Sequence, residues 1–289
     1  MPRSRHPPRE GFDPESAAAG AFGHVDNSPF SAEMIAGMDR LSGAQGVVEL
    51  RRWSIDSLSL HAGQRALEVG CGSGAMSLAL GHAVGTIGAV HGIDNSRVMI
   101  AEAKRRAAHH SQVQFDTGDA QELRFGDGEF DACYSERVFQ HLDAPDMALK
   151  EMLRVLRPGG RLVVVDTDWE TVTIDHPDAL TTRKILNFVT DVFSTNGWIG
   201  RRLPRLFRYS GLKDISLTAR SLLVPEWDPD ADPSAIGPPF FIVLPQAEER
   251  GVVTKSEADR WLAELEKLAE EDRFFASLTM FGVCAVKSQ

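Results

Sequence analysis

The stretch Leu67-Glu-Val-Gly-Cys-Gly-Ser-Gly74 decides the fold, because a short apolar run enters a turn that holds three glycines. Glycine has no side chain, so the backbone can turn sharply from a strand into a helix and a ligand can lie against the peptide units. Asp94 closes a second apolar run twenty residues after Gly74. Its carboxylate can accept hydrogen bonds from both hydroxyls of a ribose. The two features together predict a nucleotide-binding crevice.

Glycine spacing alone does not name the nucleotide. Gly70-x-Gly72-x-x-Ala75 fits the alanine-ending variant of the dinucleotide fingerprint, so an NAD-dependent oxidoreductase stays open as an alternative. Glu68 stands two residues before the first glycine, where its charge would repel a pyrophosphate. The same charge suits a cofactor that carries an ammonium and a sulfonium, which favours S-adenosylmethionine. A protein that binds this cofactor without turnover is a third hypothesis.

Two later motifs point the same way. Thr117-Gly-Asp119-Ala120 follows a third apolar segment and puts a carboxylate where an adenine amino group needs an acceptor. Val155-Leu-Arg-Pro-Gly-Gly-Arg-Leu-Val-Val-Val165 is a Pro-Gly-Gly turn that feeds a buried strand. With the 67–74 stretch, Asp94 and Phe130-Asp-Ala-Cys-Tyr-Ser135, these motifs resemble those of class I (Rossmann-like) S-adenosylmethionine-dependent methyltransferases. Within that class the chain is similar to the ubiquinone and menaquinone C-methyltransferase group, over about residues 60–166.

The resemblance implies an enzyme that moves a methyl group from S-adenosylmethionine to an O, N or C atom of a small organic molecule, leaving S-adenosylhomocysteine. Most of the rate should come from holding the nucleophile in line with the methyl, with a base only where the acceptor carries a proton. The residues expected to bind the cofactor lie in and around the motifs: Glu68, Gly70, Cys71, Gly72, Gly74, Asp94, Asn95, Met99, Asp119, Ala120 and Ser135.

Strand-like and helix-like segments alternate along the chain, which predicts an α/β fold with a doubly wound, mostly parallel sheet. The resemblance implies seven strands, the last of them antiparallel, with helical cap elaborations. Strands are expected at 66–70, 88–93, 113–117, 130–134, 160–166, 213–223 and 278–287. Helices are expected at 74–83, 96–109, 144–155, 178–195, 201–209 and 256–271.

The domain boundaries are predicted from composition and periodicity. Residues 1–25 read as a disordered N-terminus, and 26–62 as a helical N-terminal cap. The methyltransferase domain then occupies 63–289, with substrate-cap insertions at about 167–210 and 225–276. Within the second insertion, the acidic, proline-rich segment 225–239 is either a lid or disordered.

Acceptor chemistry is expected beyond the fourth and fifth strands, because ligands of such sheets bind at the carboxyl ends of strands. His141 is a candidate base, since its ordinary pKa lies near 6.5, or else a residue that orders its loop. Asp168 is the second catalytic candidate. Arg137 could anchor a carboxylate or phosphate, or pair with a neighbouring acid. Arg137, His141, Asp168 and Trp169 are therefore the predicted substrate-binding residues.

The amino-acid composition narrows down the substrates, the location and the partners to be expected. A net charge of -10 repels phosphate backbones, so nucleic acid is not the expected substrate. No run of about twenty apolar residues is present, which argues against a membrane span, and the N-terminus has no secretory signal pattern. Three cysteines without metal-like spacing indicate a reducing cytoplasm and no metal site. The amphipathic segment 257–272 leaves a homodimer contact open.

Overall fold

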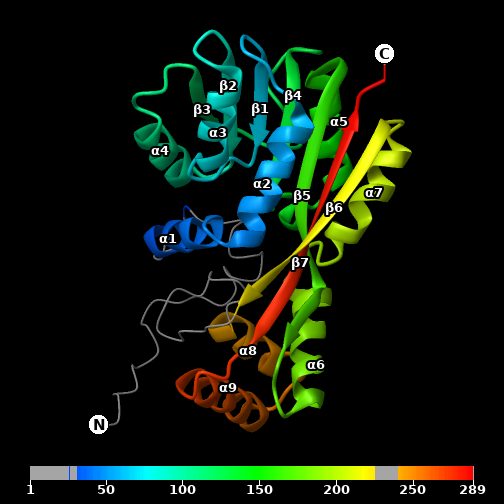
Figure 1. Ribbon diagram of the computed structural model, residues 1–289. Helices are drawn as coiled ribbons and strands as arrows, with labels where there is room; N and C mark the ends of the chain where they lie inside the picture. The colour runs from blue at the N-terminus through cyan, green and yellow to red at the C-terminus, as the bar shows by residue number, and fades with distance from the viewer. Residues whose placement is uncertain (1–25, 27–30, 225–239, 289) are drawn as a thin grey trace.

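The computed structural model describes residues 26, 31–224 and 240–288, and its centre is a seven-stranded sheet (Figure 1). The strand order is β3-β2-β1-β4-β5-β7-β6, and β7 alone runs antiparallel to its neighbours. This confirms the predicted fold class. The strands are β1 (Arg65–Val69), β2 (Ala89–Asp94), β3 (Val113–Thr117), β4 (Phe130–Glu136), β5 (Leu156–Ile174), β6 (Lys213–Val224) and β7 (Ala276–Val286).

Helices cover both faces of this sheet. Apolar side chains of α2, α3 and α4 pack on one face, and those of α5 and α7 pack on the other. The helices of this region are α1 (Ser31–Ser42), α2 (Gln45–Leu58), α3 (Ala75–Val84), α4 (Arg97–Arg106), α5 (Pro145–Val155) and α7 (Ile199–Tyr209), with a 3-10 turn η2 (Phe139–His141) after β4. The central strands β1 and β4 and the first part of β5 are buried on both faces, so they read as near-continuous apolar runs, which is why they were predictable from the sequence.

A second lobe extends beyond the central layers. It consists of α6 (Ala179–Phe188), the π-helix η3 (Val189–Phe193), α8 (Phe240–Glu249), α9 (Lys255–Glu270) and the ends of β5, β6 and β7 that they cover (Figure 1). Trp261, Leu265 and Ile185 are almost fully buried in its core. The lobe therefore has a hydrophobic core of its own, joined to the first by three continuous strands.

The second lobe also holds the main departures from the predicted elements. β5 is 19 residues long and continues to Ile174, so the segment after Asp166 begins as a strand. The predicted helix 178–195 is confirmed as helical over 179–193, but its second half is the π-helix η3 and not α-helix. The helix α8 was missed, because Pro245 lies inside it and its first residues are a bulky apolar run typical of a strand.

Some expectations fall outside what the structure describes. The predicted disorder of 1–25 and the predicted lid at 225–239 both lie outside the described residues. Among the helices that are described, none is long and apolar enough to cross a bilayer.

Replacing Leu265 by alanine should lower the free energy of unfolding by about 2–5 kcal/mol, because it removes a side chain that is 0% exposed from the core of the second lobe. The control is Leu180→Ala in the same lobe, since Leu180 is 71% exposed and its loss should cost less than about 0.5 kcal/mol. Urea unfolding measures both. Equal losses for the two variants would contradict a packed core in this lobe.

Candidate active site

The glycine turn between β1 and α3 is tight and left-handed. Gly70, Gly72 and Gly74 have φ values of +74°, +49° and +84°, which side-chain-bearing residues rarely adopt. A Cβ on Gly70 would lie 2.1 Å from Val138 Cγ2, so bulk is excluded there as well. The amides of Gly70 and Cys71 both donate to the Ile93 carbonyl at 2.8 Å, which ties the turn to the end of β2.

Asp94 links this turn to the next helix. One carboxylate oxygen accepts from the Gly72 amide and the other from the Ser96 amide, each at 2.9 Å. Burial raises the pKa of Asp94 above its usual range. Asn95 beside it is exposed, and Met99 in the first turn of α4 is buried. The predicted ribose acceptor thus stands at the carboxyl end of β2, against the glycine turn.

Glu68 lies on the β1 face that meets α3. Its side chain is 3% exposed and accepts a hydrogen bond from the Ser77 hydroxyl. Burial raises the pKa of Glu68 to about 8, so the carboxyl is largely protonated at neutral pH. Cys71 is also buried, and burial raises the pKa of its thiol. The thiol therefore remains protonated and acts as a small packing group.

The remaining residues predicted to bind the cofactor are Asp119 and Ala120, which follow β3, and Ser135, which lies near the end of β4. Asp119 is exposed and accepts from the Gln121 amide at 2.8 Å, while Ala120 is buried. Ser135 pairs in register with Val69, and its hydroxyl is fully buried with no hydrogen-bond partner in the described structure. The motifs from four strands therefore gather at one edge of the sheet.

A buried ion pair that the sequence did not reveal lies under this edge. Arg51 of α2 donates through two nitrogens to Glu136 at 2.8 and 2.9 Å, and the Tyr134 hydroxyl donates to the same carboxylate at 2.7 Å. Burial alone would raise the pKa of Glu136, but the Arg51 guanidinium outweighs burial and lowers the pKa to about 2. One sequence feature could have indicated this ion pair. Arg51 directly follows the apolar residue Leu50 in a helix whose apolar side chains pack on the sheet.

Arg137 continues β4 into the loop with strained geometry. Its φ is +58°, uncommon for a residue with a side chain, and its amide donates to the Val165 carbonyl at 2.8 Å. The side chain is 16% exposed, and its Nε is buried 3.4 Å from Glu136 without a hydrogen bond. Glu136 therefore faces two guanidiniums, Arg51 through hydrogen bonds and Arg137 through an ion pair, so the pairing of Arg137 with a neighbouring acid is found in the structure.

The 3-10 turn η2 is held against β5 by Asp166. This carboxylate is fully buried and accepts from the amides of Thr167 at 2.8 Å and Gln140 at 3.2 Å. Burial raises the pKa of Asp166 to about 7. His141 ends the turn, and burial together with the nearby Arg137 charge lowers the pKa of His141 to about 4. The ring is therefore neutral across the physiological range.

Asp168 is paired with Arg201 of α7. Arg201 donates to both Asp168 carboxylate oxygens and also to Glu170. Asp168 is 0% exposed, so this pair satisfies a buried carboxylate that the sequence offered as a catalytic and substrate-binding candidate. Trp169, next along the strand, is half-buried and donates its indole N–H to Gln140 at 2.9 Å.

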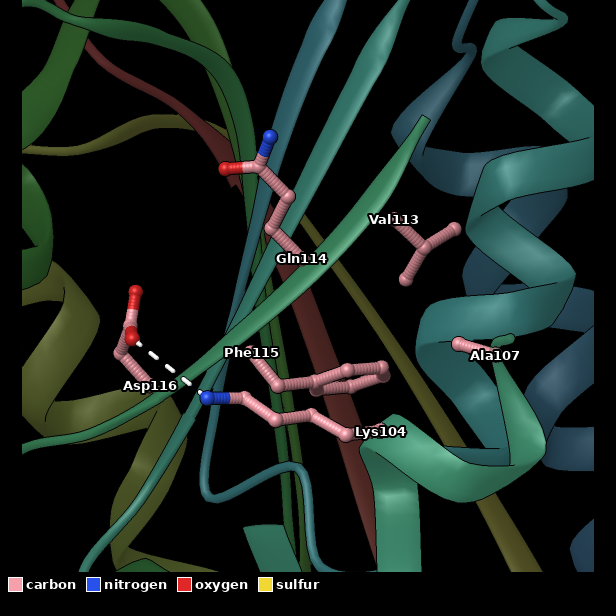
Figure 2. Close-up of a pocket in the computed structure, with 6 residues that line it drawn as sticks. All are labelled: Lys104, Ala107, Val113, Gln114, Phe115 and Asp116. Carbon is pink, nitrogen blue, oxygen red and sulfur yellow. Dashed lines mark ion pairs between the residues drawn. The ribbon is translucent and has the colours of Figure 1, made fainter. Parts of the chain in front are cut away.

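A shallow hollow of about 280 Å³ lies apart from these groups, at the β3 edge of the sheet. Figure 2 shows its lining, with Lys104 reaching from α4 toward Asp116 of β3 at 3.8 Å. The hollow includes none of the predicted site residues. Within the described part of the chain, no cluster of three or more His, Cys, Asp and Glu side chains is arranged to hold a metal ion.

Sequence comparisons agree with the geometry. The family model described as "Methyltransferase domain" matches residues 67–164. A Streptomyces fradiae protein described as "Uncharacterized 37.1 kDa protein in transposon TN4556" is 34% identical over 250 residues, covering 86% of this chain and 70% of that one. Demethylmenaquinone methyltransferase of Staphylococcus aureus is 38% identical over 141 residues, 47% of this chain and 58% of that enzyme.

Solved structures share the fold at low sequence identity. YcgJ from Bacillus subtilis superposes with a TM-score of 0.57 at 18% identity, covering 83% of this chain and 98% of that one. Phosphoethanolamine N-methyltransferase 2 of Haemonchus contortus, solved with S-adenosyl-L-methionine, gives a TM-score of 0.58 at 17% identity, covering 93% of this chain and 60% of that one.

The glycine turn, the acids at the strand ends and the order of the sheet are those of a Rossmann-like methyltransferase. The chain belongs to the class I S-adenosylmethionine-dependent methyltransferase family. It is an enzyme that takes its methyl group from S-adenosylmethionine and transfers it to a small molecule. The comparisons give no support to the alternative of an NAD-dependent oxidoreductase.

Arg51→Met should lower the free energy of unfolding at pH 7 by about 3 kcal/mol, because the buried Glu136 would lose its two hydrogen bonds from a guanidinium and keep only the more distant ion pair with Arg137. Arg52→Met is the matched control, since Arg52 is exposed on the same helix and should change stability by about 0.5 kcal/mol or less. Urea unfolding compares both variants with the native protein.

The same pair predicts a pH dependence. The folded pKa of Glu136, about 2, lies below its ordinary 4.5, so the ionised carboxylate stabilises the fold above about pH 4.5. That contribution is lost as the pH falls toward 2. The difference in the free energy of unfolding between the native protein and Arg51→Met should therefore become smaller in acid. A difference that stays constant down to about pH 3.5 would contradict this assignment.

Proposed function

We propose that the cofactor lies along the carboxyl ends of β1, β2, β3 and β4. Asp94 would hold the ribose, Asp119 the adenine, and the glycine turn would let the cofactor approach the backbone. The observation that carries the proposal is the contact of the Asp94 carboxylate with the glycine turn after β1. This turn lies where the strand order of the sheet reverses, between β1 and β4, which is where such sheets bind their ligands. The other residues predicted for this group are Glu68, Gly70, Cys71, Gly72, Gly74, Asn95, Met99, Ala120 and Ser135.

The helix α1 is the cover of this site in our proposal. Met38 reaches the glycine turn, since a Cβ on Gly72 would lie 2.6 Å from its methyl. Asp39 of the same helix forms a two-point ion pair with Arg106 of α4, both contacts at 2.8 Å. A cover fixed in this way would exclude water from the sulfonium and hold the methyl group in a defined direction.

The acceptor would enter beyond β4 and β5, where Arg137, His141 and Trp169 lie. Arg137 would offer a carboxylate or phosphate of the acceptor a buried N–H that makes no hydrogen bond in the described structure, although it forms an ion pair with Glu136 at 3.4 Å. Asp168 is better placed to fix α7 on β5 than to act in catalysis, because Arg201 engages both of its oxygens. Methyl transfer would then depend on in-line positioning, to an O, N or C atom.

Predictions about partners rest on composition. The net charge of -10 supports an acceptor other than nucleic acid. The name of the S. aureus relative specifies a demethylmenaquinone acceptor for that enzyme, and this chain spans little more than half of its length. A quinone-like acceptor is one hypothesis that the likeness supports. A cytoplasmic location and a homodimer remain predictions.

Asp94→Ala should weaken binding of S-adenosylhomocysteine at least tenfold, about 1.4 kcal/mol, because the ribose hydroxyls lose their acceptor. Asp116→Ala is the control, since Asp116 is an exposed acid on β3 that lines the hollow of Figure 2. Calorimetric titration measures both variants, with NADH as a second ligand that should not bind. Unchanged affinity in Asp94→Ala would refute the ribose assignment, and NADH binding alone would refute the cofactor.

Binding of S-adenosylmethionine at pH 7 should release about one proton per site, because Glu68 has a pKa of about 8 in the protein and a nearby ammonium and sulfonium would favour its ionised form. Calorimetry in phosphate and in Tris detects the release as a difference in apparent binding enthalpy. Affinity should rise between pH 6 and about 8 for the same reason. Glu68→Gln should bind without proton release, and a native protein with no buffer dependence would contradict the role of Glu68.

A further inference from the structure

Gln140 is a buried residue, 5% exposed, whose side-chain amide contacts three groups at the carboxyl ends of β4 and β5. Its Oε1 lies 2.9 Å from the indole nitrogen of Trp169. Its Nε2 lies 3.3 Å from the carbonyl oxygen of Arg137 and 3.1 Å from Nε2 of His141. One amide therefore joins the loop after β4 to the extended part of β5.

Two of these partners can play only one role. An indole N–H only donates, so the atom facing Trp169 must be the amide oxygen. A carbonyl only accepts, so the atom facing Arg137 must be the NH₂ group. Both partners select the same orientation of the amide. An amide flip of Gln140 would break both hydrogen bonds and would set its NH₂ group against the indole N–H and its oxygen against the Arg137 carbonyl.

The third contact then determines the state of His141. The NH₂ group of Gln140 donates toward His141 Nε2, so this ring nitrogen must accept and carries no proton. A neutral imidazole has one N–H, which places the proton on Nδ1. We propose that Gln140 is a positioning residue that holds His141 as its neutral Nδ1–H tautomer, so that Nε2 of the ring does not serve the reaction as a general base.

The surrounding backbone fixes Gln140 itself. Its amide donates to Asp166 at 3.2 Å, and its carbonyl accepts from the Asn196 amide at 3.0 Å. Trp169 is anchored in turn, because its amide donates to the Gly197 carbonyl at 2.8 Å. A side chain at Gly197 would meet the Thr190 carbonyl at 2.1 Å, so this approach requires glycine. The two lobes together set the orientation of the amide.

The charge around His141 agrees with a neutral ring. Burial and the positive charge of Arg137 both disfavour the imidazolium, and Asp166, the buried acid of β5 that holds η2, directs its oxygens at backbone amides of Thr167 and Gln140. A neutral ring with its Nε2 lone pair engaged has no free site for an incoming proton. The acceptor must therefore present a nucleophile whose proton does not pass to His141: a neutral amine, an electron-rich carbon or an oxygen that is already ionised.

The tautomer follows from the geometry of this chain alone, whereas its part in methyl transfer rests on the proposed function. The chain holds 9 histidines, so the test uses full-length protein with ¹⁵N-labelled histidine and a His141→Gln variant that identifies the His141 signals. Long-range ¹H–¹⁵N correlation spectra separate the two tautomers. We expect the Nδ1–H pattern, unchanged from pH 8 down to about 5. An Nε2–H pattern, or titration near pH 6.5, would overturn the inference.

Substitutions at Gln140 test whether this residue determines the tautomer of His141. Gln140→Glu keeps an acceptor for the Trp169 indole but turns a carboxylate oxygen toward His141, so the proton should move to Nε2 and the pKa of His141 should rise by about one unit or more. Gln140→Met is the control that removes the amide without adding charge, and it should give a mixture of tautomers. A Gln140→Glu protein that keeps the native pattern would overturn the role of Gln140.

The two proposals fail in different ways. If S-adenosylhomocysteine does not bind but His141 shows the Nδ1–H pattern, the cofactor site is wrong and the inference about Gln140 stands. If the cofactor binds and the tautomer is Nε2–H, only the inference about Gln140 is lost. Because the spectrum of the unsubstituted protein decides the tautomer, a Gln140 variant that does not fold leaves the test intact.

Discussion

The hydrogen-bonded ladder between β5 and β7, which has one irregularity between Asp168 and Thr173, is the constraint on which the rest of the structure depends. β5 is 19 residues long; it pairs with β4 on one side and, from Arg161 to Ile174, with β7 on the other. Its first half belongs to the central sheet, and its second half carries α6, α8 and α9 (Figure 1). A strand cannot bend freely without breaking ladder bonds, so the ladder holds the second lobe in a fixed place relative to the cofactor edge.

That placement explains the chemistry at the strand ends. Asp166 holds η2, Asp168 holds α7 through Arg201, and Trp169 reaches the side chain of Gln140. Three residues within one short stretch of β5 thus support two different elements, η2 and α7. The buried acids Asp166 and Asp168 are satisfied by groups of the protein itself, and they fix these elements on β5.

Charge is distributed unevenly across the same region. Glu136 is ionised and engaged by Arg51, while Glu68 and Asp166 have raised pKa values because they are buried. Arg137 adds a second positive charge beside Glu136, with which it forms an ion pair at 3.4 Å. The region thus combines one ionised carboxylate and two guanidiniums with two carboxyl groups that burial keeps largely or partly protonated near neutral pH.

The sequence by itself determined the strand-and-helix alternation, the glycine turn, the strand-end acids and the methyltransferase class, because these depend on local periodicity and on residues close together in the chain. It predicted the sheet strands within a few residues, apart from the extent of β5. Only the tertiary structure decided the pairing of Arg51 with Glu136 and of Arg201 with Asp168, the continuation of β5, and the Trp169–Gln140–His141 contact. Apart from the contact between the neighbours Gln140 and His141, the side-chain contacts join residues on different elements, up to 85 residues apart in the chain. Which of these groups meet depends on how the elements pack, which no local pattern encodes.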